Sequence, residues 1–292
     1  MPTGYTTTGS LADSLDTVVA SARIIREFEG VMPQLVDKVT LDDGTGLDWK
    51  EISYAQLTAT AVTETTVNEN YQQLSDTAFT ITPTMVQIAT LITDRVRARL
   101  SKKGLAKLGS LAQNAIQRKK DEDGITVLDG AGTSLAGTGV TLHSGHIAAA
   151  VVRIQGNATE PGLPPFRCVL APYQLYDIDA ELKAGVGTYP IQEGLTARVF
   201  KEGFKGMIGG AEVFVDGNIV ADSTPDAKGG VFAREGIVLV QGMVPKTETE
   251  RKPNIGGGAD IVYLRDEYAY GERGASNPWL FEIMSDATAP TS

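Results

Sequence analysis

The chain has 292 residues and a mass of 31.0 kDa, enough for one large or two modest domains with a sizeable buried core. Its 42% hydrophobic and 21% charged content is ordinary for a globular protein, and no apolar run is long enough to span a bilayer. With 26 basic and 36 acidic side chains, the net charge of −10 argues against a sequence-specific DNA-binding protein. The single cysteine, Cys168, excludes an internal disulfide and favours a reducing compartment.

The N-terminal segment predicts an amphipathic helix. Its apolar residues recur at spacings of three and four, at Leu11, Leu15, Val18, Ala22 and Ile25. A short helix at a chain terminus is marginal by itself, so this apolar stripe needs another surface on which to pack.

A long hairpin follows. Apolar and threonine residues alternate over 57–61 and again over 79–82, which predicts two strands, and a polar stretch at 64–76 separates them. Two strands with so few large apolar residues cannot form a packed domain. We therefore expect the hairpin to pack against another part of the protein or against another molecule.

The longest helical pattern comes next, after a strand at 85–92 and a short helical turn. Residues 103–128 keep one apolar face, and at ~1.5 Å per residue they form a rod of roughly 39 Å. Gly124 lies inside this helix, where glycine costs about 1 kcal/mol relative to alanine.

An α/β unit follows the glycine-rich link at 130–139. Its predicted elements are helices at 147–154 and 172–182 and strands at 166–171, 206–216 and 236–240. The tail adds two strands, at 260–270 and 279–284.

The sequence contains no arrangement of residues typical of a catalytic, nucleotide or metal site. Neither a Gly-x-Ser-x-Gly turn nor a phosphate-binding glycine loop is present, and a calcium loop centred on Gly124 would have Gly130 where its glutamate is needed. His143 and His146 are more typical of a helix start than of a metal site, and Cys168 lies in an apolar strand. The residues therefore predict that the protein is not an enzyme and binds neither a cofactor nor a metal ion.

Charge is strongly segregated. Residues 40–93 contain seven acids and one base, Lys50, whereas residues 95–120 contain nine bases and no acid. Three interpretations remain open: a solvated helix face, a contact between the acidic hairpin of one copy and the basic rod of another, or a rod that faces a polyanion. The candidate assembly residues are Lys50, Glu64, Glu69, Asp76, Arg95, Arg97, Arg99, Lys102, Lys103 and Lys107.

The order of these parts resembles the major capsid protein of tailed double-stranded DNA phages, with the Hong Kong 97 fold. The most suggestive stretches are residues 89–95, 169–177, 206–215 and 262–271. The resemblance implies an α+β fold with these parts: N-arm 1–40, E-loop 41–82, P-domain with spine helix 83–140, A-domain 141–245, and P-domain return strands 246–292.

The function implied by this resemblance is structural. Such a protein self-assembles into pentamers and hexamers of an icosahedral or prolate phage head, which encloses double-stranded DNA without sequence-specific binding. Portal, separate scaffold and decoration proteins are possible partners, no membrane is involved, and assembly takes place in the host bacterial cytoplasm. Lys50 is the one lysine near the E-loop, and no partner for a covalent crosslink can be identified.

Two other functions remain open. An encapsulin, a cellular compartment that encloses a cargo enzyme, has the same fold. A small-molecule enzyme built on the α/β unit is a more distant alternative, because the sequence lacks the expected catalytic arrangements.

Overall fold

The computed structural model describes residues 27–28, 30–42, 44, 46–65, 71–99, 102–185, 206–273 and 279–290, with the backbone alone at 102–108 and 183–185. The helix predicted at 11–25 lies outside the described residues and stays a prediction. Within the described part of the chain, no helix is both long enough and apolar enough to cross a membrane.

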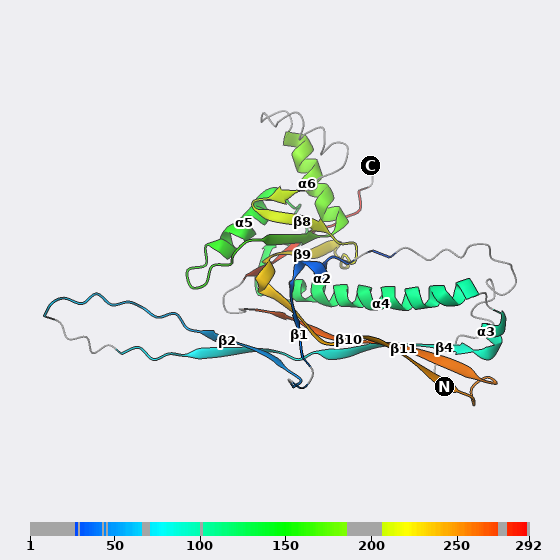
Figure 1. Cartoon of the computed structure of the whole chain (residues 1–292). Helices are drawn as coiled ribbons and strands as arrows, with labels where there is room; N and C mark the ends of the chain where they lie inside the picture. The colour runs from blue at the N-terminus through cyan, green and yellow to red at the C-terminus, as the bar shows by residue number, and fades with distance from the viewer. Residues whose placement is uncertain are drawn as a thin grey trace.

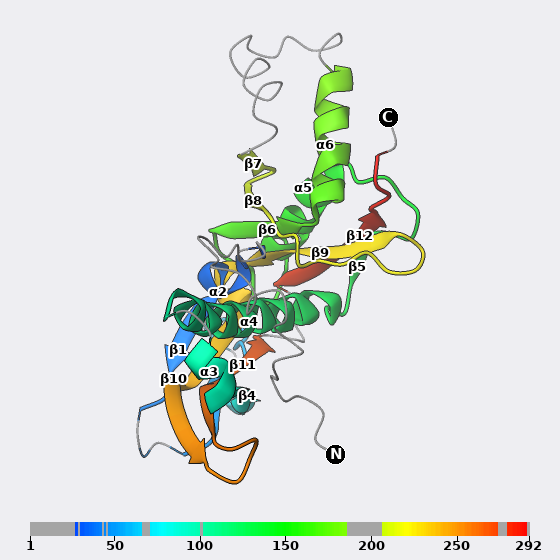
Figure 2. The same ribbon diagram turned by 90° about the vertical axis from the view of Figure 1, so that its right-hand side faces the viewer.

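The long helix α4, Lys102–Asp129, lies between two sheets (Figure 1; Figure 2). A four-stranded sheet runs along one side of it, and a six-stranded sheet lies on the other. A two-stranded hairpin projects beyond the four-stranded sheet, away from the end that carries the short helix α3, Asp94–Arg99 (Figure 1). The predicted rod-like helix is confirmed.

Strands from both halves of the chain form the four-stranded sheet, in the order β1-β10-β11-β4. Its strands are β1, Asp37–Thr40; β10, Ile237–Lys252; β11, Ala259–Glu272; and β4, Thr84–Thr93. β1 is parallel to β10, and the other pairs are antiparallel. The strands predicted at 85–92 and 260–270 are confirmed, whereas the strand that begins near 237 runs well past residue 245, the expected end of the A-domain.

Gly124 does not interrupt α4. The short helix α2, Met32–Leu35, crosses α4 at this point. A Cβ atom at position 124 would lie 2.8 Å from the Cβ of Met32, closer than two carbon atoms can pack. The glycine therefore costs some helix propensity but permits the close approach of α2.

The six-stranded sheet has the order β5-β12-β9-β6-β8-β7. Its strands are β5, Ser134–Ala136; β12, Leu280–Asp286; β9, Asp226–Ala233; β6, Phe166–Leu170; β8, Ala211–Val215; and β7, Met207–Ile208. The single strand predicted at 206–216 is wrong, because the chain turns at Gly209 and Gly210, both with positive φ, and forms β7 and β8 as a hairpin. The strand predicted at 279–284 is confirmed as β12, which pairs with β9 and β5.

Both faces of the six-stranded sheet are buried. Phe166, Cys168 and Leu170 of β6 pack on α5, Ser144–Gln155, and α6, Pro172–Gly185, whereas Val169 points to the opposite side, toward the cluster that contains Leu128 of α4. This alternation follows from the two-residue period of a strand. A 3-10 turn, η1, Arg234–Gly236, then leads from β9 into β10.

The hairpin consists of β2, Trp49–Tyr54, and β3, Asp76–Ile81, paired antiparallel from Trp49 opposite Ile81 to Tyr54 opposite Asp76. The second predicted strand is confirmed, but the first is wrong: residues 57–61 form no regular strand, and β2 lies closer to the base of the hairpin. The regular pairing is confined to the part of the hairpin nearest the four-stranded sheet, where packing stabilises it.

Candidate assembly surfaces

Aromatic and aliphatic packing anchors the base of the β2–β3 hairpin. The Trp49 ring packs edge-on against Phe79, with 6.1 Å between ring centroids. Ile81, at the end of β3, is buried against Val238 and Val240 of β10. The hairpin is therefore fixed at its base to the four-stranded sheet.

Arg273 adds a polar clamp at the same place. Its Nε donates to Glu51 of β2 at 2.8 Å, its Nη1 donates to the carbonyl oxygen of Glu235 at 2.8 Å, and its Nη2 lies 3.4 Å from a carboxylate oxygen of Asp37 on β1. The guanidinium also lies over the Trp49 ring. Sequence analysis missed Arg273, because its partners Asp37 and Glu51 precede it by more than two hundred positions.

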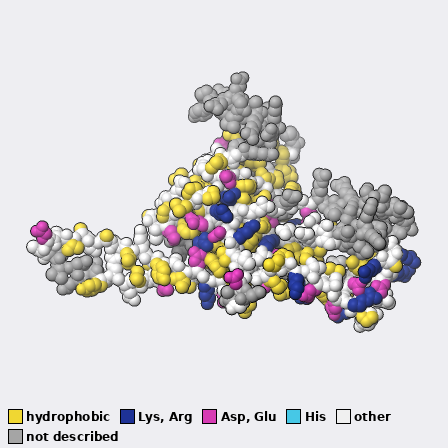
Figure 3. All heavy atoms as spheres, in the orientation of Figure 1, with side chains coloured by type: hydrophobic (Ala, Val, Ile, Leu, Met, Phe, Trp, Pro, Cys, Tyr) yellow, Lys and Arg dark blue, Asp and Glu magenta, His cyan; other side chains and the backbone are white. Residues whose placement is uncertain are grey.

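The hairpin beyond its base exposes large apolar side chains. Tyr71 is 90% exposed, and six such residues line the two arms: Ile52, Tyr54, Leu57, Val62, Tyr71 and Leu74. Figure 3 shows hydrophobic side chains along this projecting part. A monomer leaves this apolar area in water, which is typical of an interaction surface.

The acidic candidates of the hairpin differ in their surroundings. Glu64 and Asp76 are exposed, as is Lys50, and Glu69 lies outside the described residues. Asp48, by contrast, accepts a hydrogen bond from the Thr82 hydroxyl at 2.7 Å. Among the described acids of the hairpin, Glu64 and Asp76 are therefore exposed to solvent and available to another molecule.

The basic candidates begin on α3. Arg95, Arg97 and Arg99 are exposed, and Arg97 pairs with Asp260 of β11. Arg251 of β10 pairs with Asp260 as well, at 3.1 Å, and with Asp94. Figure 3 shows basic and acidic side chains gathered together at this end of the molecule.

These ion pairs reduce the uncompensated positive charge at the start of the spine. The hydrogen bond from Arg251 is the main cause that lowers the pKa of Asp94. Lys102, Lys103 and Lys107 lie in the first turns of α4, and the positions of their side chains are outside the described part.

The second half of the basic run is not an external basic face. Lys120 is buried, lies 3.1 Å from Asp266, donates to Gln241 Oε1 at 2.9 Å, and sits over the Tyr268 ring. Arg118 pairs with Glu27 at 3.3 Å, and Lys119 pairs with Asp123. The hypothesis of one basic rod from 95 to 120 is therefore wrong for Lys120, which is buried and paired with Asp266 of β11. Arg118 and Lys119 are exposed, but Glu27 pairs with the first and Asp123 of the same helix with the second.

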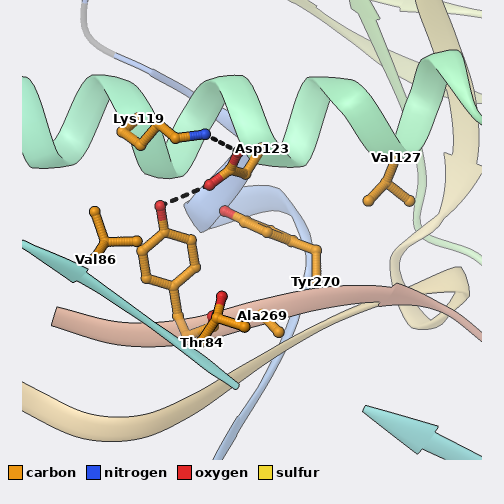
Figure 4. A pocket seen from close by; sticks show the side chains of 8 residues that line it. Thr84, Val86, Lys119, Asp123, Val127, Ala269 and Tyr270 are labelled. Atoms are coloured by element: carbon orange, nitrogen blue, oxygen red, sulfur yellow. Dashed lines mark hydrogen bonds and ion pairs between the residues drawn. The ribbon is translucent and has the colours of Figure 1, made fainter. Parts of the chain in front are cut away.

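A cavity of about 350 Å³ lies between α4 and the strands β4 and β11 (Figure 4). It is lined by Thr84, Val86, Lys119, Asp123, Val127, Tyr268, Ala269 and Tyr270. The Tyr268 hydroxyl donates to Asp123 at 2.8 Å, and burial together with this acceptor raises the pKa of Tyr268. The described lining contains no histidine, cysteine or serine, and its one carboxylate, Asp123, is bound to both Tyr268 and Lys119.

The two histidines and the cysteine have structural roles. The amide of His143 donates to His146 Nδ1 at 3.2 Å, at the start of α5, which confirms the predicted capping role. Cys168 is fully buried, and burial raises the pKa of its thiol, as expected for an inert side chain. Among the residues that the structure describes, no group of three or more potential ligands is placed to hold a metal ion.

The acidic and basic candidate surfaces lie far apart in one chain. The hairpin projects at one end of the four-stranded sheet, whereas α3 and the first turns of α4 lie at the other (Figure 1). A contact between these surfaces, if it forms, therefore joins two copies of the chain.

Known protein structures resemble this chain over nearly its whole length. A structure titled "Capsid structure of the Cyanophage P-SCSP1u" superposes with a TM-score of 0.71 and 13% sequence identity, over 97% of this chain and 96% of that one. "Capsid of Ralstonia phage GP4" gives a TM-score of 0.68 and 14% identity, over 95% and 97% of the two chains. "Mycobacterium phage Che8" gives 0.67 and 14%, over 92% and 97%.

Comparison by sequence reveals no such relatives, because no protein-family model and no curated protein matches the chain. The fold is nevertheless that of phage capsid proteins, and the α+β Hong Kong 97 fold expected from the sequence is confirmed. The long helix α4 is consistent with the spine helix of that fold, and the assignment of residues 41–82 as the E-loop stays a prediction.

Proposed function

We propose that this chain is a structural major capsid protein, which self-assembles into pentamers and hexamers of a phage head. The observation that carries the proposal is the likeness of fold to phage capsid proteins over 92–97% of the chain. The exposed apolar hairpin supports it, because neighbouring copies in a shell would cover side chains that a monomer leaves in water.

Electron microscopy of the purified full-length chain tests this proposal. We expect closed shells at high protein concentration, and a fast-sedimenting species in the ultracentrifuge. A chain that stays monomeric over a wide range of concentration and salt, while correctly folded by circular dichroism, contradicts the proposal.

Gene neighbours distinguish a phage head from an encapsulin, because both form shells. Adjacent genes for a portal and a terminase support the phage head, whereas an adjacent cargo enzyme supports the cellular compartment. The portal, scaffold and decoration proteins, the head shape and assembly in the host bacterial cytoplasm belong to the same proposal, and they are tested by the composition of particles purified from infected cells.

The packaged DNA is proposed to be enclosed without sequence-specific binding. A net charge of −10 supports this, because a duplex repels an acidic protein over most of its surface. We expect purified chains to leave duplex DNA unretarded in a gel at physiological salt, whatever its sequence. Retardation of one sequence but not of another contradicts this part of the proposal.

Contact between charged surfaces of neighbouring copies is proposed to assist assembly. The acidic side is Glu64, Glu69 and Asp76 of the hairpin, and the basic side is Arg95, Arg99, Lys102, Lys103 and Lys107. Exposed pairs are worth only about 0.2–1 kcal/mol each, but symmetry repeats them at every interface. Salt screens them, so assembly should weaken as the salt concentration rises if these contacts dominate, and improve if burial of apolar surface dominates.

Charge reversal tests this contact. Changing Lys102, Lys103 and Lys107 to Glu should lower the yield of shells, and changing Glu64, Glu69 and Asp76 to Lys in the same chain should partly restore it. Reversal of Lys38, Arg234 and Lys246, which are exposed elsewhere, controls for net charge. If empty shells form normally but the amount of packaged DNA changes, the basic segment faces the genome. If neither changes, the segment is a solvated helix face.

A further inference from the structure

Two buried carboxyl groups meet where three parts of the chain join. Asp121 lies on α4, and Asp216 directly follows β8. Asp121 Oδ1 accepts a hydrogen bond from the backbone N–H of Met32 at 3.0 Å, and Asp216 Oδ2 accepts one from the N–H of Val31 at 3.3 Å. The exposed fractions of the two residues are 0% and 1%. Together they bind the segment that enters α2.

Asn218 joins the two carboxyl groups from the loop between β8 and β9. Its backbone N–H donates to Asp216 Oδ1 at 2.9 Å, and its side-chain amide donates to Asp121 Oδ2 at 2.8 Å. Both carboxyl groups are therefore buried beside the same residue, and each accepts hydrogen bonds from N–H donors. Because two like charges buried next to each other repel, a single proton held by the pair would stabilise this arrangement.

The surroundings do not neutralise a second negative charge. Lys120, Lys119 and Arg118, the cations that directly precede Asp121 on α4, are paired with Asp266, Asp123 and Glu27 respectively. On β11, the buried Tyr270 hydroxyl has no hydrogen-bond partner among the described residues. In the described part of the chain no ion pair joins a Lys or Arg to either member of the pair.

Burial is the main cause that raises the pKa of Asp121 to about 7, and the hydrogen bond with Asp216 is the next. The negative charge on Asp121 in turn contributes, after burial, to the raised pKa of Tyr270, so this hydroxyl remains protonated and adds no charge. A pKa of about 7 for Asp121 makes the charge at this site sensitive to pH near neutrality.

We propose that Asp121 and Asp216 form a proton-controlled latch for the segment that enters α2. With one shared proton, the pair and Asn218 hold Val31 and Met32 against α4 and the β8–β9 loop. Loss of that proton leaves two like charges buried beside Asn218, which push α4 and the loop apart and loosen the segment. All three parts belong to one chain, so the latch does not depend on the proposed function.

The pH dependence of unfolding tests the shared proton. An acid whose pKa is raised by folding contributes stability that is complete below its unfolded pKa of about 4 and is lost as the pH rises through its folded pKa. Relative to Asp216→Asn or Asp121→Asn, the unfolding constant of the unmodified chain should rise by up to about tenfold per pH unit between pH 5 and 7, and level off above that.

Glu122→Gln is the matched control, because it removes a negative charge from the exposed face of the same helix. It should keep the slope of the unmodified chain. Either asparagine variant suffices for the comparison if the other does not fold. Equal slopes for the unmodified chain and a folded asparagine variant would overturn the proposal.

Amide hydrogen exchange tests whether the effect is local. After correction for the intrinsic effect of pH, protection at Val31 and Met32 should fall at least fivefold from pH 6 to pH 8 in the unmodified chain. It should stay constant in Asp216→Asn and in the β6 amides 168–170 of both proteins. Constant protection at Val31 and Met32, or an equal fall in β6, would overturn the latch.

Discussion

The six-stranded sheet and the β2–β3 hairpin use the same alternation of apolar and polar residues with opposite results. In the sheet, helices α5 and α6 cover one face and α4 covers the other, so Phe166 and Phe232 are almost completely buried. In the hairpin, burial is confined to the base: Ile81 is 5% exposed, whereas Tyr71 is 90% exposed. The sheet unit buries its own apolar side chains, whereas the hairpin leaves most of its apolar side chains exposed.

The difference follows from the number of elements that pack together. A two-stranded hairpin has no layer against which to bury either face, and such hairpins are marginal in water. Trp49, Phe79 and Arg273 fix only the end that touches the four-stranded sheet. Substitutions in the two regions should therefore separate folding of the subunit from assembly.

The largest effect on folding is expected for Phe166→Ala in β6. The side chain is buried among α5 and the neighbouring strands, so its removal leaves a cavity and should lower the free energy of unfolding by about 3–5 kcal/mol. Urea unfolding measures this loss. Phe166→Leu should lower the free energy of unfolding clearly less. Equal stability of the alanine variant and the unmodified chain would contradict tight packing around Phe166.

A comparable loss is expected where α4 meets the four-stranded sheet. Lys120→Ala would leave Asp266 buried and unpaired, at a cost of about 3–5 kcal/mol. The double variant Lys120→Met with Asp266→Leu removes both charges and should regain most of the stability in the same urea titration. A double variant no more stable than the single one would contradict this explanation.

An intermediate effect is expected for the clamp at the base of the hairpin. Arg273→Met removes the bonds to Glu51, Asp37 and the Glu235 carbonyl, and should lower the free energy of unfolding by about 1–3 kcal/mol. Hydrogen exchange should speed up more in β2 than in β9. Arg265→Met on β11, the strand that precedes Arg273, is the control; it breaks an ion pair with Glu248 and should change stability by about 1 kcal/mol or less.

The smallest effect on folding is expected near the tip of the hairpin. Tyr71→Ser combined with Leu74→Ser should change the free energy of unfolding by no more than about 0.5 kcal/mol, because both side chains are already exposed. The yield of shells, measured by sedimentation, should nevertheless fall strongly. Shells at the normal yield would mean that the exposed apolar residues of the hairpin are not covered on assembly.

Local sequence pattern was a good guide to some elements and a poor guide to others. The long helix and the strands β4, β6 and β11 followed from the spacing of their apolar residues. β9 was missed, because its sequence, Asp-Ala-Lys-Gly-Gly-Val-Phe-Ala, contains two glycines and two charged residues. Pairing with β12 on one side and β6 on the other holds it in place despite this weak propensity.

The candidate charges illustrate the same limit. Runs of acids and bases are visible in the sequence, but the partners of Lys120, Arg97 and Asp48 are not. Asp121 and Asn218 meet across 97 positions, and Arg273 and Asp37 across 236. No spacing rule predicts such contacts, because the path of the chain between the two residues decides them.

The sequence by itself determined the order of the parts, the length of the spine helix, the acidic hairpin and the lack of motifs typical of catalysis. These depend on local periodicity and composition, which act over a few residues. Only the tertiary structure decided that β1 lies parallel to β10, that β12 joins the six-stranded sheet, and that Asp121 and Asp216 meet at Asn218. Those features arise when distant segments exclude water together, so burial and charge partners exist only once the chain has folded.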